Sequence, residues 1–144
     1  MVSGMCKLFR SVEFLVRRKL TLADIGEITR NILLHFIDSS LLFDGYSSKI
    51  LNSHYGYDAA FVSAVEGAKS DEEVKKIIIS QLTVDASKIS PSCIEIVRWA
   101  CEIVSIRAAQ LAACAIAAVI IYTKNHEKPA NEPDAGVDVG LDGS

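Results

Sequence analysis

The sequence predicts a predominantly α-helical fold with a short strand at the C-terminal end, and three observations support this prediction. Apolar residues recur every three or four positions through most of the chain, which is the spacing of a helix face. Residues that commonly begin helices precede the apolar segments, namely Thr21, Ser70 and the pair Ser90 and Pro91. The last eight residues, VDVGLDGS, are instead typical of a short strand that enters a glycine turn.

The first predicted helical segment, residues 6–20, is basic and amphipathic. Leu8, Val12 and Leu15 recur in it at helical spacing. The cationic residues beside them are Lys7, Arg10, Arg17, Arg18 and Lys19. Two interpretations are open: a helix that binds a membrane surface or a partner, or a solvated insertion without a partner, which we favour.

The next helix is predicted over residues 21–38. Thr21 can cap it, because Asp24 follows three positions later at the capping-box position, and the polar run after Asp38 should end it. We expect its buried face to consist of Ile25, Ile28, Ile32 and Phe36. A turn is predicted after it at Asp44 and Gly45, which follow three apolar residues.

Two shorter helices are predicted next, over residues 57–67 and 71–82. Ser70 caps the second, with Glu73 at the capping-box position. Glu72 is placed to pair with Lys76, a contact that contributes only about 0.2–0.5 kcal/mol on an exposed helix. We expect the buried face of the first to be Ala59, Val62 and Val65.

A long helix is predicted from Pro91 to Thr123, and its second half is the least polar part of the chain. Seven alanines between Ala108 and Ala118 leave little side-chain bulk there, so that neighbouring elements can approach closely. The uninterrupted apolar run is only the twelve residues Leu111 to Tyr122, whereas a membrane span needs about 20. We therefore expect a buried helix of a soluble protein and no transmembrane segment.

Composition narrows the class of protein. The chain has 144 residues, half of them apolar, which suits one domain, and its formal charge of −3 gives nucleic acid no general attraction. The start MVSGMCKLFR lacks the features of a secretory signal, so a cytoplasmic location is expected. The four cysteines show no metal-binding spacing with the histidines, and buried, reduced thiols are predicted for Cys6, Cys93, Cys101 and Cys114.

No catalytic motif stands out. The chain has no GxxxxGK[ST], GxGxxG or GxSxG motif, and no isolated pair of carboxylates that spacing would nominate as acid and base. The residues alone therefore predict a helical domain without a catalytic or metal site of its own.

Several stretches, taken in order, resemble the larger lobe of a fungal-type hexokinase. They are MVSGM, GEITRNILLHF, LLFDGYSSKILNSHYGYDAAFVSAVEG, IVRWACEIVSIRAAQLAACAIAAVI and VDVGLDGS. The resemblance implies an α/β kinase of the actin-like ATPase fold, and a chain that is one partial large-lobe domain. It implies transfer of a phosphoryl group from ATP, with Mg²⁺ held through the nucleotide, to the 6-hydroxyl of glucose, fructose or mannose, the first step of glycolysis.

The resemblance also implies three groups of nucleotide contacts. Gly4 and Met5 match a turn near the nucleotide, and Gly143 and Ser144 match the start of an adenosine motif. The third group is a stretch of the long helix: Ile106, Arg107, Ala108, Ala109 and Gln110. Glycine and alanine would let the nucleotide approach the backbone closely. Without the family resemblance, each of these residues is equally well explained as part of the core or of a turn.

The chain departs from the family pattern in three ways. Ile106 stands where the family has threonine, which removes a hydroxyl from the phosphate side. Residues 6–25 form a basic insertion within a motif, for which a retained intron or a faulty gene model is our preferred explanation, and residues 124–136 form a polar loop. The family's glycine-rich phosphate loop, sugar-binding residues and catalytic aspartate would precede Met1, so we expect the isolated chain to be inactive.

A second class of function stays open beside the phosphotransferase. The chain would then be a non-catalytic helical module, with a regulatory role or with a surface for a partner or a membrane. No residue of the chain is nominated as catalytic or metal-binding in either case.

Overall fold

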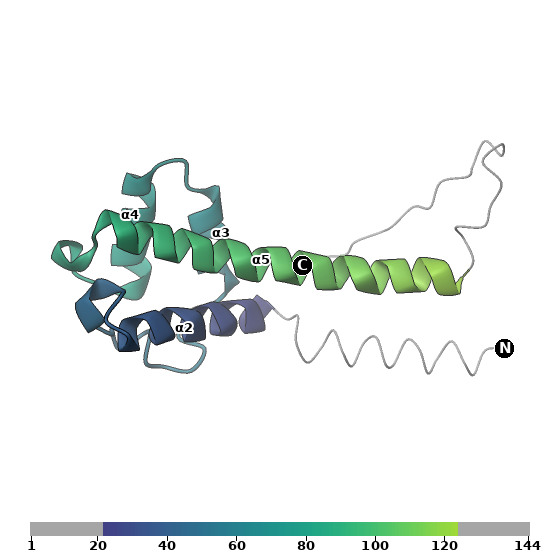
Figure 1. Ribbon diagram of the computed structural model, residues 1–144, viewed down its shortest axis with the longest axis horizontal. Helices are drawn as coiled ribbons and strands as arrows, with labels where there is room; N and C mark the ends of the chain where they lie inside the picture. Colours follow the sequence, from purple (N-terminus) through teal and green to yellow (C-terminus); the bar gives the residue numbers. More distant parts are fainter. Residues whose placement is uncertain (1–21, 124–144) are drawn as a thin grey trace. The chain divides into compact units, whose positions relative to one another are not determined.

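The computed structural model describes residues 22–123, and all of the regular structure in that range is helical (Figure 1). Four α-helices and two single-turn 3₁₀ helices follow one another: α2 (Leu22–Asp38), η1 (Phe43–Gly45), α3 (Ala59–Gly67), α4 (Asp71–Leu82), η2 (Ala86–Lys88) and α5 (Pro91–Tyr122). The predicted helical character is confirmed. The predictions for residues 6–20, for the Thr21 cap, for the loop 124–136 and for the terminal strand lie outside the described residues.

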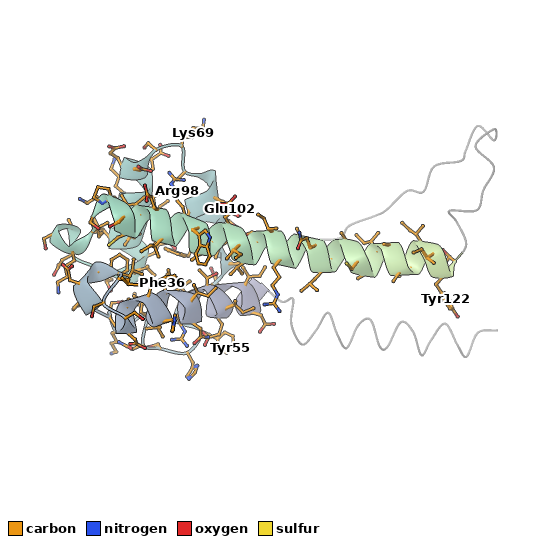
Figure 2. The ribbon with its side chains drawn as sticks, viewed as in Figure 1. Phe36, Tyr55, Lys69, Arg98, Glu102 and Tyr122 are labelled. Carbon is orange, nitrogen blue, oxygen red and sulfur yellow. The ribbon has the colours of Figure 1, made fainter. Side chains whose placement is uncertain are left out.

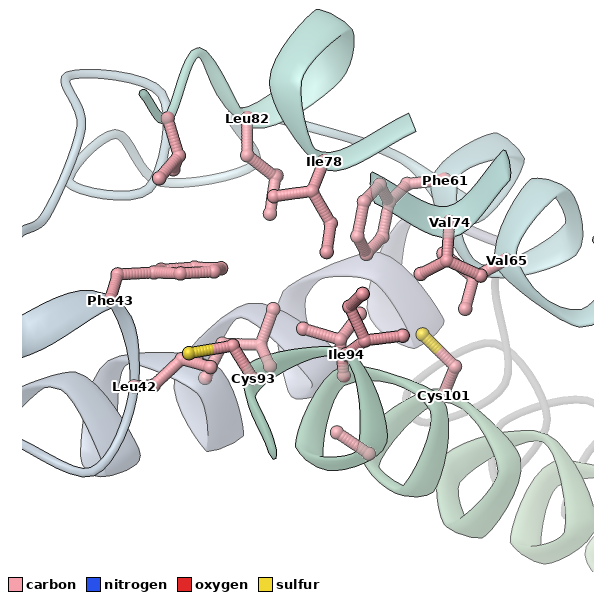
Figure 3. Packing of buried hydrophobic residues seen from close by; sticks show 14 of the residues in the cluster. Leu42, Phe43, Phe61, Val65, Val74, Ile78, Leu82, Cys93, Ile94 and Cys101 are labelled. Atoms are coloured by element: carbon pink, nitrogen blue, oxygen red, sulfur yellow. The ribbon is translucent and has the colours of Figure 1, made fainter. Parts of the chain in front are cut away.

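The chain divides into two compact units, Met1–Ala109 and Gln110–Ser144, which are described separately. In the first unit, α2, α3, α4 and the start of α5 surround one hydrophobic core (Figure 3). The largest side chains that the core buries completely include Leu33, Leu42, Phe43, Leu51, Phe61, Ile78 and Leu82. These come from α2, α3, α4 and the segment between α2 and α3, and α5 adds Val97, so the unit has a core of its own.

Helix α2 has the predicted bounds, but its buried face was predicted wrongly. The buried residues are Gly26, Thr29, Arg30, Leu33 and Ile37, while the expected face lies half-buried at the edge of the core. Two of the buried residues are polar, and both have hydrogen-bond partners. The Thr29 hydroxyl donates to the Ile25 carbonyl at 2.9 Å, and Arg30 is bonded as described below. Partnered polar groups can be buried at little cost, and an apolar pattern does not reveal them.

Gly26 allows α2 to lie close to the segment that enters α3. A side chain at this position would place its Cβ 2.7 Å from the Tyr57 carbonyl oxygen and 2.9 Å from the Asp58 carbonyl carbon, and both of these neighbours are backbone atoms. The close approach holds the start of α3 against α2. Asp58 then caps α3, since its Oδ1 accepts a hydrogen bond from the Ala60 N–H at 2.7 Å.

The turn predicted at Asp44 and Gly45 is confirmed. Phe43, Asp44 and Gly45 all have positive φ angles, of 51°, 52° and 75°. Phe43 is nevertheless fully buried, so the turn inserts an aromatic ring into the core between α2 and the following loop. The predicted face of α3 is confirmed as well, and Phe61 joins it in the core.

The predicted cap of α4 is confirmed, although its details differ. The Ser70 hydroxyl accepts from the Glu73 N–H at 3.3 Å, while the Glu73 carboxylate reaches one residue further back, to the Lys69 N–H at 2.7 Å. The predicted pair of Glu72 with Lys76 is wrong, because the ion pairs within residues 22–123 do not include it. Exposed side chains of this length lose entropy when they pair, which cancels a weak attraction.

Helix α5 agrees with the prediction to within one residue, but only its first half is buried. Its buried residues are Cys93, Ile94, Val97, Ala100, Cys101 and Val104. After Val104 every described side chain is exposed or half-buried, and only 6% of the most apolar eighteen-residue stretch of α5 is buried. The prediction of a buried helix is therefore wrong for this half. By length and composition, α5 is also apolar enough to cross a membrane, contrary to our estimate from the twelve-residue run.

The cysteines of α5 follow the same division. Cys93 and Cys101 are buried and free, as predicted, and burial raises the pKa of the Cys101 thiol to about 12. Cys114, in the second half, is free but exposed, so the expectation of a buried thiol is wrong there.

Candidate nucleotide-binding segment

The predicted nucleotide-binding stretch lies on α5 directly after the last buried residue of that helix. Ile106, Arg107, Ala109 and Gln110 are exposed, and Ala108 is half-buried. The Ile106 side chain is 49% exposed. The stretch therefore offers a ligand an open surface rather than a pocket. Gly4, Met5, Gly143 and Ser144 lie outside the described residues, so the assignment of all nine positions stays a prediction.

Helical spacing divides this stretch into two sides. Ile106 and Ala109 are three positions apart and share a face, whereas Arg107 projects about 100° away from Ile106. Alanine leaves room for a flat base to approach the helix, and an exposed guanidinium can form paired hydrogen bonds with phosphate oxygens. Ile106 presents only carbon, so it contributes no hydrogen bond to a phosphate.

Arg98 anchors the part of α5 that precedes the stretch. Its guanidinium donates to the carbonyl oxygens of Ala68 at 3.3 Å and Ser70 at 3.0 Å, and to the Asp71 carboxylate at 3.3 Å. These bonds tie α5 to the turn between α3 and α4, where helix ends leave backbone groups to be satisfied. The anchor and the core fix the direction of α5 up to Val104, and thereby position the residues that follow.

A cleft of 280 Å³ lies beside this anchor, lined by Val65, Glu66, Arg98 and Glu102. Figure 2 shows Arg98 and Glu102 on neighbouring turns of α5. None of the five nucleotide-binding candidates that the structure describes, residues 106–110, lines it. The spacing of four positions between Arg98 and Glu102 could be recognised in the sequence as one face of a helix. The two lining residues of α3 lie more than thirty residues earlier, and no local signal indicates that they line the same cleft.

The most tightly connected charged cluster of the described residues lies at the other side of the unit, on α2. The Glu27 carboxylate accepts two hydrogen bonds from Arg30, at 2.7 and 2.6 Å, and one from the Tyr55 N–H at 2.9 Å. The His54 Nδ1 lies 3.2 Å from it. Arg30 also donates to the Leu51 carbonyl at 2.6 Å. The cluster therefore fastens the loop of residues 51–55 to α2.

The charge of Arg30 determines the ionisation of this cluster. The hydrogen bonds from Arg30 lower the pKa of Glu27 from 4.5 to about 2, and the bonds from Tyr55 and His54 act in the same direction against the effect of burial. Glu27 is therefore an anion at any physiological pH. Its bonding capacity is used by the loop, which indicates a structural rather than a catalytic role. Arg30 is only three residues from Glu27, but sequence reasoning missed the cluster because the loop residues that complete it lie 24 to 28 residues away from Glu27.

Within residues 22–123 no group of three or more histidine, cysteine or acidic side chains is arranged to hold a metal ion. The described site is thus one exposed helical surface, held in place by a small core and an arginine anchor.

Comparison with known proteins assigns this helical unit to a class of sugar kinases. Residues 25–144 match the model of the family described as hexokinase. The chain therefore belongs to the hexokinase family, and the resemblance noted in the sequence is confirmed. The match begins at the end of the predicted insertion 6–25 and does not include residues 1–5.

Individual relatives give the same assignment at moderate identity. Hexokinase-1 of Rattus norvegicus and of Homo sapiens are each 31% identical over 120 residues, and hexokinase HKDC1 of Homo sapiens is 32% identical over 120 residues. The aligned region is 83% of this chain but only 12% of each relative. The chain thus spans about one eighth of the length of the curated relatives that it matches.

Proposed function

We propose that the chain is part of the larger lobe of an ATP-dependent hexose phosphotransferase. The observation that carries the proposal is the family match over residues 25–144, which includes all but three of the described residues. In this function α5 supplies one wall of the ATP site through residues 106–110. The γ-phosphoryl group leaves ADP and forms a bond with the 6-hydroxyl oxygen of glucose, fructose or mannose, whose proton passes to a base.

The residues of this chain would orient the nucleotide rather than perform the transfer. Arg107 would contact phosphate oxygens, and the small Ala108 and Ala109 would accept the nucleoside. Bound Mg²⁺, held through the nucleotide, would neutralise charge as the phosphoryl group moves. None of the described residues is a candidate for the base, so we expect the chain alone to be inactive. As a sugar kinase of glycolysis it would act in the cytoplasm.

The domain organisation that goes with this function is a single partial large-lobe domain over residues 1–144. Residues 6–25 interrupt it as a basic insertion, and residues 124–136 form a polar loop. The exposed apolar half of α5 supports this organisation, since a helix of that composition is normally covered by other parts of a larger fold.

A direct test replaces Ile106 by threonine, which is the residue of the family pattern. Ile106→Thr should strengthen the binding of a fluorescent ATP analogue by about tenfold or more, because one added hydrogen bond to a charged phosphate contributes at least about 1.5 kcal/mol. Ile121→Thr, the same change at an exposed position about four turns later on the helix, is the matched control and should leave binding unchanged. Equal affinity in both variants and the unsubstituted chain would remove α5 from the nucleotide site.

Catalysis is tested separately with purified chain, ATP, Mg²⁺ and glucose in an assay coupled to glucose 6-phosphate. We expect no product above the background of a mock purification. ATP-dependent turnover that persists after removal of host kinases would contradict the inactivity of the isolated chain while supporting the family activity.

The second candidate function is a non-catalytic module that binds a membrane. The observation that favours it is the exposure of Leu111, Ile121 and Tyr122 on a helix that is long and apolar enough to span a bilayer. Flotation with vesicles of neutral phospholipid distinguishes the two functions. Stable insertion that resists high salt would favour the membrane function, and a chain left at the bottom of the gradient would exclude it.

A further inference from the structure

Helix α5 carries an exposed apolar stripe on the side opposite its buried face. The stripe, called the α5 stripe below, consists of Trp99, Ile103 and Ile106, which are 49%, 44% and 49% exposed. Their spacing of four and then three residues places them in one row along the helix. All three belong to the first unit of the chain, in the part of α5 that the core holds in place. The row is therefore an ordered surface.

Helix α2 borders the α5 stripe and orients its largest member. The rings of Phe36 and Trp99 meet edge to face, with centroids 5.9 Å apart and an angle of 86° between their planes. This geometry is the favourable one for two aromatic rings. Because Phe36 is itself only half-buried, the apolar surface extends from α5 on to α2.

Two carboxylates flank the α5 stripe. Glu95 and Glu102 are both exposed, and they are helical neighbours of Trp99, four positions before it and three positions after it. Glu102 is also four positions before Ile106. Among the cations near by, Arg98 is already bonded to the α3–α4 turn, and Arg107 neighbours Ile103 on the other side of the row. One side of the stripe is therefore acidic.

The basic segment 6–20 has the complementary pattern. Its apolar residues Leu8, Val12 and Leu15 show the same spacing of four and then three, and its five cations outnumber the single anion, Glu13. Two rows with equal spacing can pack side by side along parallel or antiparallel helices. Opposite charges beside them favour such a contact over a contact with an uncharged surface.

The position of the segment in the chain also suits the α5 stripe. Helix α2 and the first half of α5 run in opposite directions (Figure 1), and Phe36 contacts Trp99 near the end of α2. Along α2, the start of the helix lies about 21 Å from Phe36. Along α5 in the same direction, Ile106 lies only about 10 Å from Trp99, so the start of α2 is beyond Ile106. The six residues 16–21 are enough to bridge the remaining distance of about 10 Å, whether helical or extended.

We propose that residues 6–20 dock on the α5 stripe, with Leu15 near Ile106, Val12 near Ile103 and Leu8 near Trp99. Docking covers the exposed side of the tryptophan and places cations beside Glu95 and Glu102. It also covers Ile106, the first residue of the candidate nucleotide-binding segment, so that the insertion competes with a ligand there. The direct connection to α2 makes the contact intramolecular and keeps its effective concentration high.

The test uses Trp99, which is the single tryptophan of the chain. The full chain is fused at its C-terminus to a soluble, tryptophan-free domain, and quenching of fluorescence by acrylamide is measured. Val12→Asp should raise the quenching constant by about twofold. Without the docked segment the Trp99 side chain is 49% exposed, so undocking makes the side of the ring that the segment covers accessible to acrylamide again. Phe14→Asp is the matched control: it introduces the same charge in the same segment but off the row, and quenching should not change.

A second variant addresses the charges on α5. Glu95→Lys combined with Glu102→Lys should raise quenching as Val12→Asp does, while the circular dichroism spectrum stays unchanged because both positions are exposed. Equal quenching in Val12→Asp, Phe14→Asp and the unsubstituted chain would overturn the proposal. Protection that disappears on dilution would also overturn it, because the occupant of the α5 stripe would then be a second copy of the chain.

Discussion

Both halves of α5 are rich in apolar residues, but their surroundings differ. The half up to Val104 contributes six residues to the core, whereas the half from Ser105 to Tyr122 contributes none, although it is the more apolar of the two. The row that is buried in the first half continues into the second at helical spacing, through Leu111 and Tyr122, which are 41% and 49% exposed. Apolar side chains are buried only where other elements cover them. The difference is the one expected if α5 belongs to a larger fold, as in the function proposed above.

The largest expected difference between the two halves of α5 is in how much stability the chain loses when a charged residue is introduced into each half. Val97→Asp puts a carboxylate at a fully buried position without a partner, and should lower the free energy of unfolding by about 3–5 kcal/mol. Ile121→Asp makes a similar change at a side chain that is 62% exposed, and should leave stability within about 0.5 kcal/mol. Urea unfolding followed by circular dichroism measures both. Equal losses in the two variants would mean that the second half is packed after all.

A polar anchor of the first unit gives the next largest effect. Glu27→Gln removes the charge that satisfies the buried Arg30, and should cost about 2–4 kcal/mol of stability. Glu72→Gln on α4, where the carboxylate has no ion pair, is the matched control and should cost less than about 0.5 kcal/mol. The same urea titration measures these variants. A mild effect of Glu27→Gln would show that the loop 51–55 does not depend on the cluster.

The same residue predicts how stability changes with pH. The pKa of Glu27 is about 2 in the folded chain and 4.5 in the unfolded chain, so the folded state binds the proton less readily. The contribution of Glu27 is therefore fully present above about pH 5 and decreases as the pH falls towards 2. Unfolding curves measured between pH 6 and pH 2.5 should show a decrease that is smaller in Glu27→Gln. Parallel pH profiles in the two proteins would contradict the assignment of this pKa.

The smallest effect concerns a single buried hydroxyl. The Tyr57 hydroxyl is buried and has no hydrogen-bond partner among residues 22–123, and burial raises its pKa. Tyr57→Phe removes this unsatisfied group while keeping the ring that packs on Phe61, and should raise stability by up to about 1 kcal/mol. Tyr55→Phe, at a 60% exposed position, is the control and should be neutral. A clear loss of stability in Tyr57→Phe would reveal a partner for the hydroxyl.

Local signals in the sequence were sufficient for the helix bounds. Ser70 and Ser90 mark helix starts by accepting a hydrogen bond from the N–H three positions later, and Pro91 suits the first helical position because it has no N–H to leave unpaired, so these signals are encoded within a single turn. The turn at Asp44 and Gly45 was predictable for the same reason. These features depend only on neighbouring residues.

Long-range contacts explain what the sequence could not predict. The buried face of α2 includes Arg30, which is satisfied by the Leu51 carbonyl 21 residues away, and the Glu27 cluster and the cleft at Glu102 likewise join distant segments. The apolar pattern alone did not predict the exposure of the second half of α5; only the family resemblance, which makes the chain one part of a larger lobe, implied an exposed apolar patch there. An apolar pattern shows what a helix could bury, but it does not show whether a partner is present. The candidate nucleotide-binding positions came from the family resemblance alone.

The central claim is that the second half of α5 is an interface for other parts of a larger fold. Sedimentation velocity of the purified chain over a range of concentrations tests it most directly. We predict concentration-dependent association that is suppressed when Leu111 and Ile121 are both replaced by lysine, because these changes interrupt the exposed apolar surface. A monodisperse monomer that unfolds cooperatively, with the same behaviour in the doubly substituted chain, would contradict the account.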